Sequence, residues 1–213
     1  MMVKGPYRTI VYVDGFNFYY GEVRHTPYKW LNPELLFQKL LGPQNALIKV
    51  KYFTARVQPS SQDPDTHHRQ DVYLRALQAH CPLTELHFGH FLRHKIPAEH
   101  ANPPPSRVEI WKNEEKGSDV NLALHLLNDA WLDAYDCAVV VSNDSDLAES
   151  LRLVKKQHKK LIGLVTPGAP KRKTSAQLRQ HADFLKPIRT WMLRSSQLPD
   201  VIPGSSIHKP VTW

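Results

Sequence analysis

Apolar runs and amphipathic stretches alternate along most of the chain. Continuous apolar runs, which are typical of parallel strands buried on both faces, occupy residues 8–14, 46–54, 137–142 and 161–165. Apolar residues at helical spacing occupy residues 33–41, 65–80, 119–134, 147–158 and 175–185. Strands that alternate with helices predict an α/β domain of three layers (α/β/α) with a mostly parallel central sheet.

The middle of the chain departs from this simple alternation. Strand-like segments at 84–92 and 107–112 flank a proline-rich loop at 97–106, which is too irregular for the core. We count the segment at 107–112 among five core strands. The helix that follows it carries one apolar face, formed by Val120, Ala123, Leu124, Leu127 and Trp131.

The last amphipathic pattern ends near residue 185. We therefore expect one domain at 1–190, followed by a C-terminal tail at 191–213 with little order beyond Arg194. No internal repeat divides the chain further.

Four aspartates are expected at one edge of the sheet. Asp14 closes the first strand, and Asp144 and Asp146 follow a later one. Asp119 begins a helix that a right-handed crossover brings to the same edge, where ligands of parallel sheets bind. Clustered carboxylates repel one another unless a cation neutralises them. Mg²⁺ or Mn²⁺ accepts oxygen ligands and keeps waters that can attack a phosphodiester. The pattern predicts a catalytic metal site.

Structural roles compete with these assignments. Each aspartate taken singly is typical of a helix N-cap, whereas four at one edge favour a metal site. Asn17 is either a turn residue or a hydrogen-bonding neighbour of the metal and phosphate. Lys116 is either solvated or a partner of phosphate and acid charges. Both alternatives stay open.

The net charge of +8 and a pI near 9.5 favour a polyanionic partner, with nucleic acid first. Cations near the carboxyl ends of strands are candidates for holding the backbone: Arg56, Lys171, Arg172 and Lys173. Lysines at 155–160 are more typical of a solvated helix end. Tyr19, Tyr20 and Trp30 belong either to the core or to a base-stacking surface.

Several classes of protein are disfavoured. No apolar run reaches the roughly 20 residues that span a bilayer, and no signal-peptide pattern is seen, so we expect no membrane partner. Two cysteines favour a reducing compartment, and we expect a cytoplasmic protein. The segment after the first strand lacks the glycine pattern of dinucleotide-binding folds, which argues against a nucleotide cofactor. Histidine pairs such as His67-His68 favour zinc less than the aspartates favour Mg²⁺ or Mn²⁺.

The sequence resembles NYN-domain proteins, a branch of the PIN-like nucleases that includes the LabA group. Five segments in the family's order carry the resemblance: 11–18 (VYVDGFNF), 52–56 (YFTAR), 69–77, 115–121 (EKGSDVN) and 141–147 (VSNDSDL). They extend over roughly residues 8 to 185. Ser118 departs from the valine found before the helix aspartate in many relatives, and it leaves the acid in place.

The resemblance implies a PIN-like fold and a metal-dependent ribonuclease that cuts RNA. We expect single strands to be favoured, because an unpaired backbone bends into a recessed site more easily than an A-form helix. It maps Asp14, Asp119, Asp144 and Asp146 onto the family's acidic metal site, with Asn17 beside it. A non-catalytic RNA-binding or regulatory module is the alternative. Assembly into a homo-oligomer, the number of metals and endo- versus exonucleolytic cleavage stay open.

Overall fold

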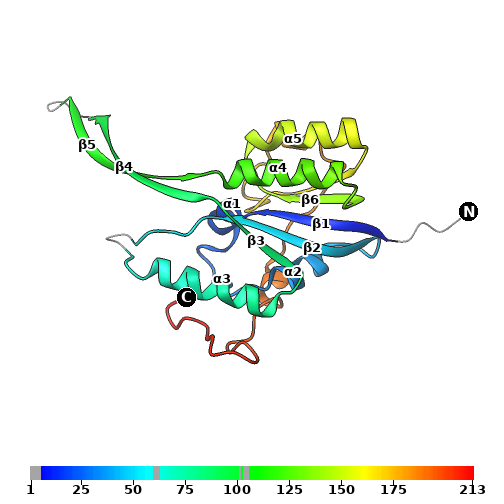
Figure 1. Ribbon diagram of the computed structural model, residues 1–213, viewed down its shortest axis with the longest axis horizontal. Helices are drawn as coiled ribbons and strands as arrows, with labels where there is room; N and C mark the ends of the chain where they lie inside the picture. The colour runs from blue at the N-terminus through cyan, green and yellow to red at the C-terminus, as the bar shows by residue number, and fades with distance from the viewer. Residues whose placement is uncertain (1–5, 60–62, 101, 103–105) are drawn as a thin grey trace, which may run out of the picture.

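A computed structural model describes residues 6–59, 63–100, 102 and 106–213. Its centre is a six-stranded, all-parallel sheet in the order β3-β2-β1-β6-β7-β8 (Figure 1). The strands are β1 (Tyr7–Asp14), β2 (Asn45–Thr54), β3 (Thr84–Phe88), β6 (Cys137–Val141), β7 (Leu161–Val165) and β8 (Phe184–Leu185). The expected α/β class with a mostly parallel sheet is confirmed.

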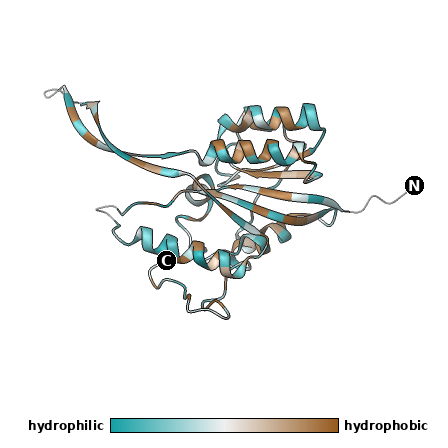
Figure 2. Ribbon diagram, viewed as in Figure 1, coloured by the Kyte–Doolittle hydropathy of each residue, from teal (hydrophilic) through white to brown (hydrophobic). Residues whose placement is uncertain are grey.

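Helices cover both faces of this sheet (Figure 1). On one face lie α4 (Ser118–Trp131) and α5 (Ala148–Leu153), and on the other lie α2 (Pro33–Leu40) and α3 (Thr66–His80). Successive side chains of a strand point to opposite faces. In β1, Ile10 and Tyr12 therefore pack in the α4 core, whereas Val11 and Val13 pack in the α2 core. The central strands are largely hydrophobic, while α4 and α5 alternate between hydrophobic and hydrophilic bands (Figure 2).

Short helical elements complete the body. They are α1 (Gly15–Phe18), η1 (Tyr19–Val23), η2 (Ser145–Leu147), η3 (Val154–His158), α6 (Ala176–Arg179) and α7 (Thr190–Arg194). At α2, the side chain of Asn32 accepts a hydrogen bond from the Leu35 amide at 3.1 Å, and Pro33 occupies the first helical position. No helix in the described ranges is long and apolar enough to cross a membrane.

A two-stranded antiparallel hairpin projects from the body (Figure 1). It consists of β4 (His90–Glu99) and β5 (Arg107–Lys116), in a register that pairs His90 with Lys116. The count of 107–112 among the core strands is wrong, because this strand lies outside the main sheet. The proline-rich loop is shorter than expected, since Pro97 belongs to β4; residues 101 and 103–105 of that loop lie outside the described residues.

Gly89 explains why the predicted strand at 84–92 divides. A Cβ at this position would lie 2.5 Å from the carbonyl oxygen of Lys116, so the chain crosses β5 closely only with glycine here. The segment before it stays in the sheet as β3, and the segment after it leaves as β4. The hairpin therefore rises from the carboxyl edge of the sheet.

The apolar face expected on α4 is only partly its buried face: Ala123 and Leu127 pack against the core, and the other three residues do not. Val120, Leu124 and Trp131 are 55%, 59% and 77% exposed. The side chains that contact the sheet instead include Leu122 and Leu126. Asp129 is also buried, and this charged residue within the core-facing stripe breaks the hydrophobic periodicity from which the face was inferred.

The end of the chain is ordered against the body. Leu198, Ile202 and Ile207 are buried in a cluster with Trp30, so the expectation of little order beyond Arg194 is wrong. Trp30 is fully buried and belongs to the core. The helix predicted at 175–185 is also wrong in extent: only Ala176–Arg179 is α-helical, and β8 follows at Phe184–Leu185.

Candidate metal centre

Three carboxylates meet at the carboxyl edge of the sheet. One carboxylate oxygen each of Asp119, Asp144 and Asp146 lies within 4.8 Å of the other two. Asp119 and Asp144 are half-buried, and Asp146 is exposed. Across the described ranges, no other group of three histidine, cysteine or acidic side chains meets this distance. The residues come from the start of α4 and from the loop after β6, as the topology of a parallel sheet requires.

Local backbone geometry brings these side chains together. Asp144 is extended and caps η2, because its Oδ1 accepts a hydrogen bond from the Asp146 amide at 3.1 Å. Gly117 has a φ of 89°, a left-handed conformation that favours glycine, and it turns the chain from β5 into α4. Glu115 supports that turn by accepting a hydrogen bond from the Ser118 amide at 3.0 Å. Capping and a metal site are therefore compatible for Asp144.

Asp14 lies beside this group and not within it. It is only 8% exposed, and its two oxygens accept hydrogen bonds from the Asn17 amide at 3.0 Å and the Ser142 hydroxyl at 2.8 Å. Burial raises the pKa of Asp14, the two hydrogen bonds oppose that rise, and the charge of Asp144 adds to it. The Ser142 hydroxyl also accepts a hydrogen bond from the Asp144 amide at 3.1 Å. Ser142 thus connects Asp14 to the carboxylate group.

The loop after β7 lies against the same edge. Asn143 fixes it at two points, by donating to the Lys173 carbonyl at 3.0 Å and accepting from the Ser175 amide at 2.7 Å. Arg172 donates to the side-chain oxygen of Asn17 at 3.3 Å. Lys171, Arg172 and Lys173 are all exposed. The loop therefore brings Arg172 next to Asn17, whose backbone amide is hydrogen-bonded to Asp14, and Lys171 and Lys173 flank Arg172 in the chain.

Glu22 supports the loop from the other side. Its carboxylate accepts a hydrogen bond from the Gly168 amide at 2.7 Å, and burial raises the pKa of Glu22 despite this bond. The roles of Glu22, Ser142 and Asn143 were not predicted from the sequence. No pattern in one sequence marks residues whose role is to connect two loops.

Two candidate cations make their contacts away from the carboxylates. Lys116 pairs with Glu114 at 3.0 Å, and the lysines on both sides of Glu114 lower its pKa to about 2. Arg56 pairs with Asp71 at 2.7 Å and lies over the ring of Phe88. Neither side chain is brought into contact with the aspartate group.

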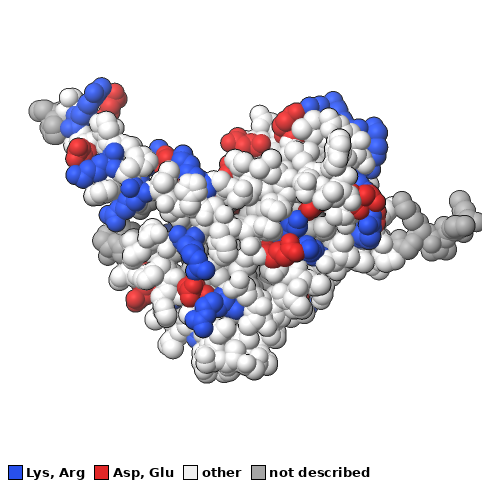
Figure 3. Space-filling model, in the orientation of Figure 1, with Lys and Arg blue, Asp and Glu red and all other residues white. Residues whose placement is uncertain are grey.

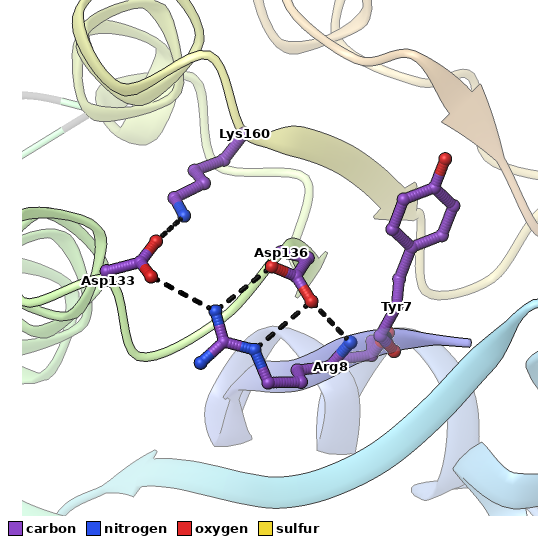
Figure 4. A network of polar contacts seen from close by, with 6 residues as sticks. Tyr7, Arg8, Asp133, Asp136 and Lys160 are labelled. Atoms are coloured by element: carbon purple, nitrogen blue, oxygen red, sulfur yellow. Dashed lines mark hydrogen bonds and ion pairs between the residues drawn. The ribbon is translucent and has the colours of Figure 1, made fainter. Parts of the chain in front are cut away.

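The opposite edge of the sheet holds a separate polar network (Figure 4). Arg8, at the start of β1, pairs with Asp136 at 3.0 Å and with Asp133 at 3.3 Å. Lys160 also pairs with Asp133. Part of the lysine cluster at 155–160 is thus neutralised far from the carboxyl edge. The Lys160 side chain is only 13% exposed, so this lysine is ion-paired and not solvated as expected.

Comparisons with known proteins place this geometry in a family. The sequence is 34% identical to 6-hydroxy-3-succinoylpyridine 3-monooxygenase HspA of Pseudomonas putida over 236 aligned positions, which cover 98% of this chain and 76% of that protein. The fold is similar to the crystal structure of a Vibrio parahaemolyticus protein of unknown function, with a TM-score of 0.54 and 18% identity, covering 93% of this chain and 100% of that one. This second likeness shows the fold alone. The NYN domain pattern matches residues 8–188. The chain therefore belongs to the NYN domain family.

Proposed function

We propose that this protein is a metal-dependent ribonuclease that hydrolyses phosphodiester bonds of RNA. The observation that carries the proposal is the convergence of three carboxylate oxygens within 4.8 Å at the carboxyl edge of the sheet. The donor set is all oxygen, which suits Mg²⁺ or Mn²⁺ better than softer metals. A bound metal would neutralise phosphate charge and lower the pKa of a coordinated water.

The residues of the chain have separate roles in this proposal. Asp119, Asp144 and Asp146 would hold the metal. Asp14 completes the acidic site, with its carboxylate oriented by the Ser142 hydroxyl and the Asn17 amide. The Asn17 side chain accepts a hydrogen bond from Arg172, and together the two would contact the phosphate.

Exposed cations near the edge would hold the RNA backbone. Lys171, Arg172 and Lys173 are the candidates, because Asn143 ties their loop to the residues after β6. Lys and Arg side chains also follow the β4–β5 hairpin, interleaved with acidic ones (Figure 3). A flexible single strand can bend its backbone into the site more easily than an A-form duplex can. We expect single-stranded RNA to be the better substrate.

The test is incubation of the purified protein with end-labelled RNA in Mg²⁺, Mn²⁺ or EDTA. One strand is used alone and annealed to its complement, at equal salt. The proposal predicts cleavage that needs the metal and is at least about tenfold faster on the single strand. Binding without cleavage under every metal condition would instead support a non-catalytic RNA-binding module.

The likeness to HspA favours a second candidate, chemistry on a small heteroaromatic molecule. A monooxygenase places one oxygen atom of O₂ in its substrate and reduces the other to water with two electrons from a reductant. Oxygen uptake is therefore measured with 6-hydroxy-3-succinoylpyridine and NADH as the two-electron donor. Uptake that depends on the pyridine substrate would favour this candidate, whereas no uptake together with metal-dependent RNA cleavage would favour the nuclease.

A further inference from the structure

A cavity of about 280 Å³ lies between α1, η1 and the first half of α3, next to the ends of β1 and β2. It is on the α3 side of the sheet, and the C-terminal residue Trp213 contributes to its wall. None of the four aspartates of the proposed metal site lines it. The cavity is thus a second candidate binding site that shares the carboxyl edge with the first.

Aromatic rings form much of the wall. Tyr19 and Tyr20 meet edge to face with ring centroids 5.3 Å apart, and Phe16 stacks on Tyr20 at 6.5 Å. Tyr20 is 56% exposed, although aromatic side chains gain most from burial. Rings arranged in this way offer faces and edges to a flat ring of a ligand.

The charges in the wall favour an anion. The wall contains two cations, Lys29 and Arg69, and one carboxylate, Asp63. Arg69 pairs with Asp63. Lys29 forms no ion pair with any side chain in the described parts of the chain, and it is half-buried. A half-buried cation without a protein partner gains most from an anionic ligand, because a charge-assisted hydrogen bond is stronger there than in water.

A neutral hydrogen-bond donor accompanies these cations. A tyrosine hydroxyl, with an ordinary pKa of about 10, keeps its proton at neutral pH, and burial raises the pKa of Tyr19 further. The volume is just below the range of about 300–1,000 Å³ common for small-molecule sites, which leaves room for one ring with a short substituent.

We propose that this cavity binds a planar heteroaromatic ring that carries an anionic group, with the ring against Tyr19 and Tyr20 and the anion at Lys29. Two sources have this chemistry: a free heteroaromatic carboxylate and a single nucleotide, either free or within RNA. Binding requires no metal, so the proposal stands or falls independently of the nuclease assignment.

Isothermal titration calorimetry of the full chain in EDTA tests this proposal. The probes are 6-hydroxynicotinate, its uncharged amide and uridine 3′-monophosphate. We expect at least one anionic probe to bind, and the amide to bind more weakly than the carboxylate. Binding of 6-hydroxynicotinate alone identifies a free carboxylate as the ligand class, and binding of the nucleotide alone identifies a nucleotide. No binding of either anion at millimolar concentration overturns the proposal.

Variants locate the binding. Lys29→Met keeps the length of the side chain and removes its charge, and it should weaken anion binding about tenfold or more, as expected for one lost charge-assisted hydrogen bond. Tyr20→Leu, at an exposed position, should also weaken it. Lys156→Met is the matched control, because Lys156 is exposed on a different part of the surface. Anion affinities unchanged in both cavity variants would show that the probe binds elsewhere.

Discussion

Ser142 donates a hydrogen bond of 2.8 Å from its hydroxyl to the carboxylate of Asp14, 128 residues earlier in the chain. The same hydroxyl accepts a hydrogen bond from the Asp144 amide. One small side chain thus sets the position of a buried acid from β1 relative to an acid of the loop after β6.

Replacing Ser142 with Ala should lower the rate of RNA cleavage more than it lowers stability. The loss of one hydrogen bond to a buried carboxylate costs roughly 1–3 kcal/mol of the free energy of unfolding. We expect kcat to fall about tenfold or more while KM for RNA changes little, because Ser142 positions acids and does not hold RNA. Ser145→Ala is the control, since Ser145 is exposed in the same loop. Equal kcat values for the two variants would argue against this positioning role.

The loop after β7, which carries Lys171, Arg172 and Lys173, should dominate the salt dependence of RNA binding. Replacing Lys171, Arg172 and Lys173 with Gln should weaken binding and reduce the slope of log affinity against log salt by about 0.7 for each lost phosphate contact. The matched control neutralises Lys155, Lys156 and Lys159 in the same way. A steeper loss in the control than in the loop variant would reverse the assignment of the RNA-binding surface. Fluorescence anisotropy in EDTA separates this measurement from cleavage.

A buried ion pair should make a large contribution to stability. Lys51 pairs with Asp129 at 2.6 Å, both side chains are under 10% exposed, and the Tyr12 hydroxyl donates to the same carboxylate. Lys51→Met leaves a buried charge unpaired, which costs about 3–5 kcal/mol of unfolding free energy. Adding Asp129→Leu should recover much of that loss. Urea denaturation measures the unfolding free energies of the single and the double variant. Lys49→Met is the control: it removes an exposed pair with Glu85 and should cost under about 1 kcal/mol.

The Lys51–Asp129 pair also explains why the buried face of α4 could not be predicted from the sequence. The order of strands and helices follows from apolar patterns, because parallel strands buried on both faces leave long apolar runs. The buried face of α4 does not follow, because Asp129 lies within it and is tolerated only through Lys51 and Tyr12, residues of distant strands. Likewise, the aspartates could be assigned to one edge from topology, whereas the contacts of Ser142, Asn143 and Glu22 depend on how separate loops meet.

The separate β4–β5 hairpin could not be predicted from the sequence pattern either. Its strands have a mixed pattern of apolar and charged residues, which is also compatible with an edge strand of the main sheet. The chain leaves the sheet at Gly89, where its backbone passes close to that of Lys116. In the sequence, a lone glycine within a strand pattern indicates only that some irregularity occurs there.

The ion-pair network around Arg8, at the start of β1, should make the free energy of unfolding depend on pH. The hydrogen bond from Arg8 lowers the pKa of Asp136 to about 2, below the roughly 3.9 of an unfolded aspartate. A lowered folded-state pKa stabilises the protein above the unfolded pKa, and this contribution is lost as the pH falls toward 2. Arg8→Met should therefore destabilise the protein at pH 7 and progressively less between pH 4 and pH 2. A difference in urea midpoint that is constant from pH 7 to pH 2.5 would contradict this assignment.

Cleavage by the Asp144→Asn variant is the sharpest test of the proposed metal site. The amide keeps the shape of the side chain and removes one charged ligand, so circular dichroism should show an unchanged fold. Initial rates on a labelled single strand in Mn²⁺ should fall by about a hundredfold or more relative to the parent protein. A folded Asp144→Asn variant that cleaves RNA at the parent rate would contradict the assignment of this carboxylate group as the catalytic metal site.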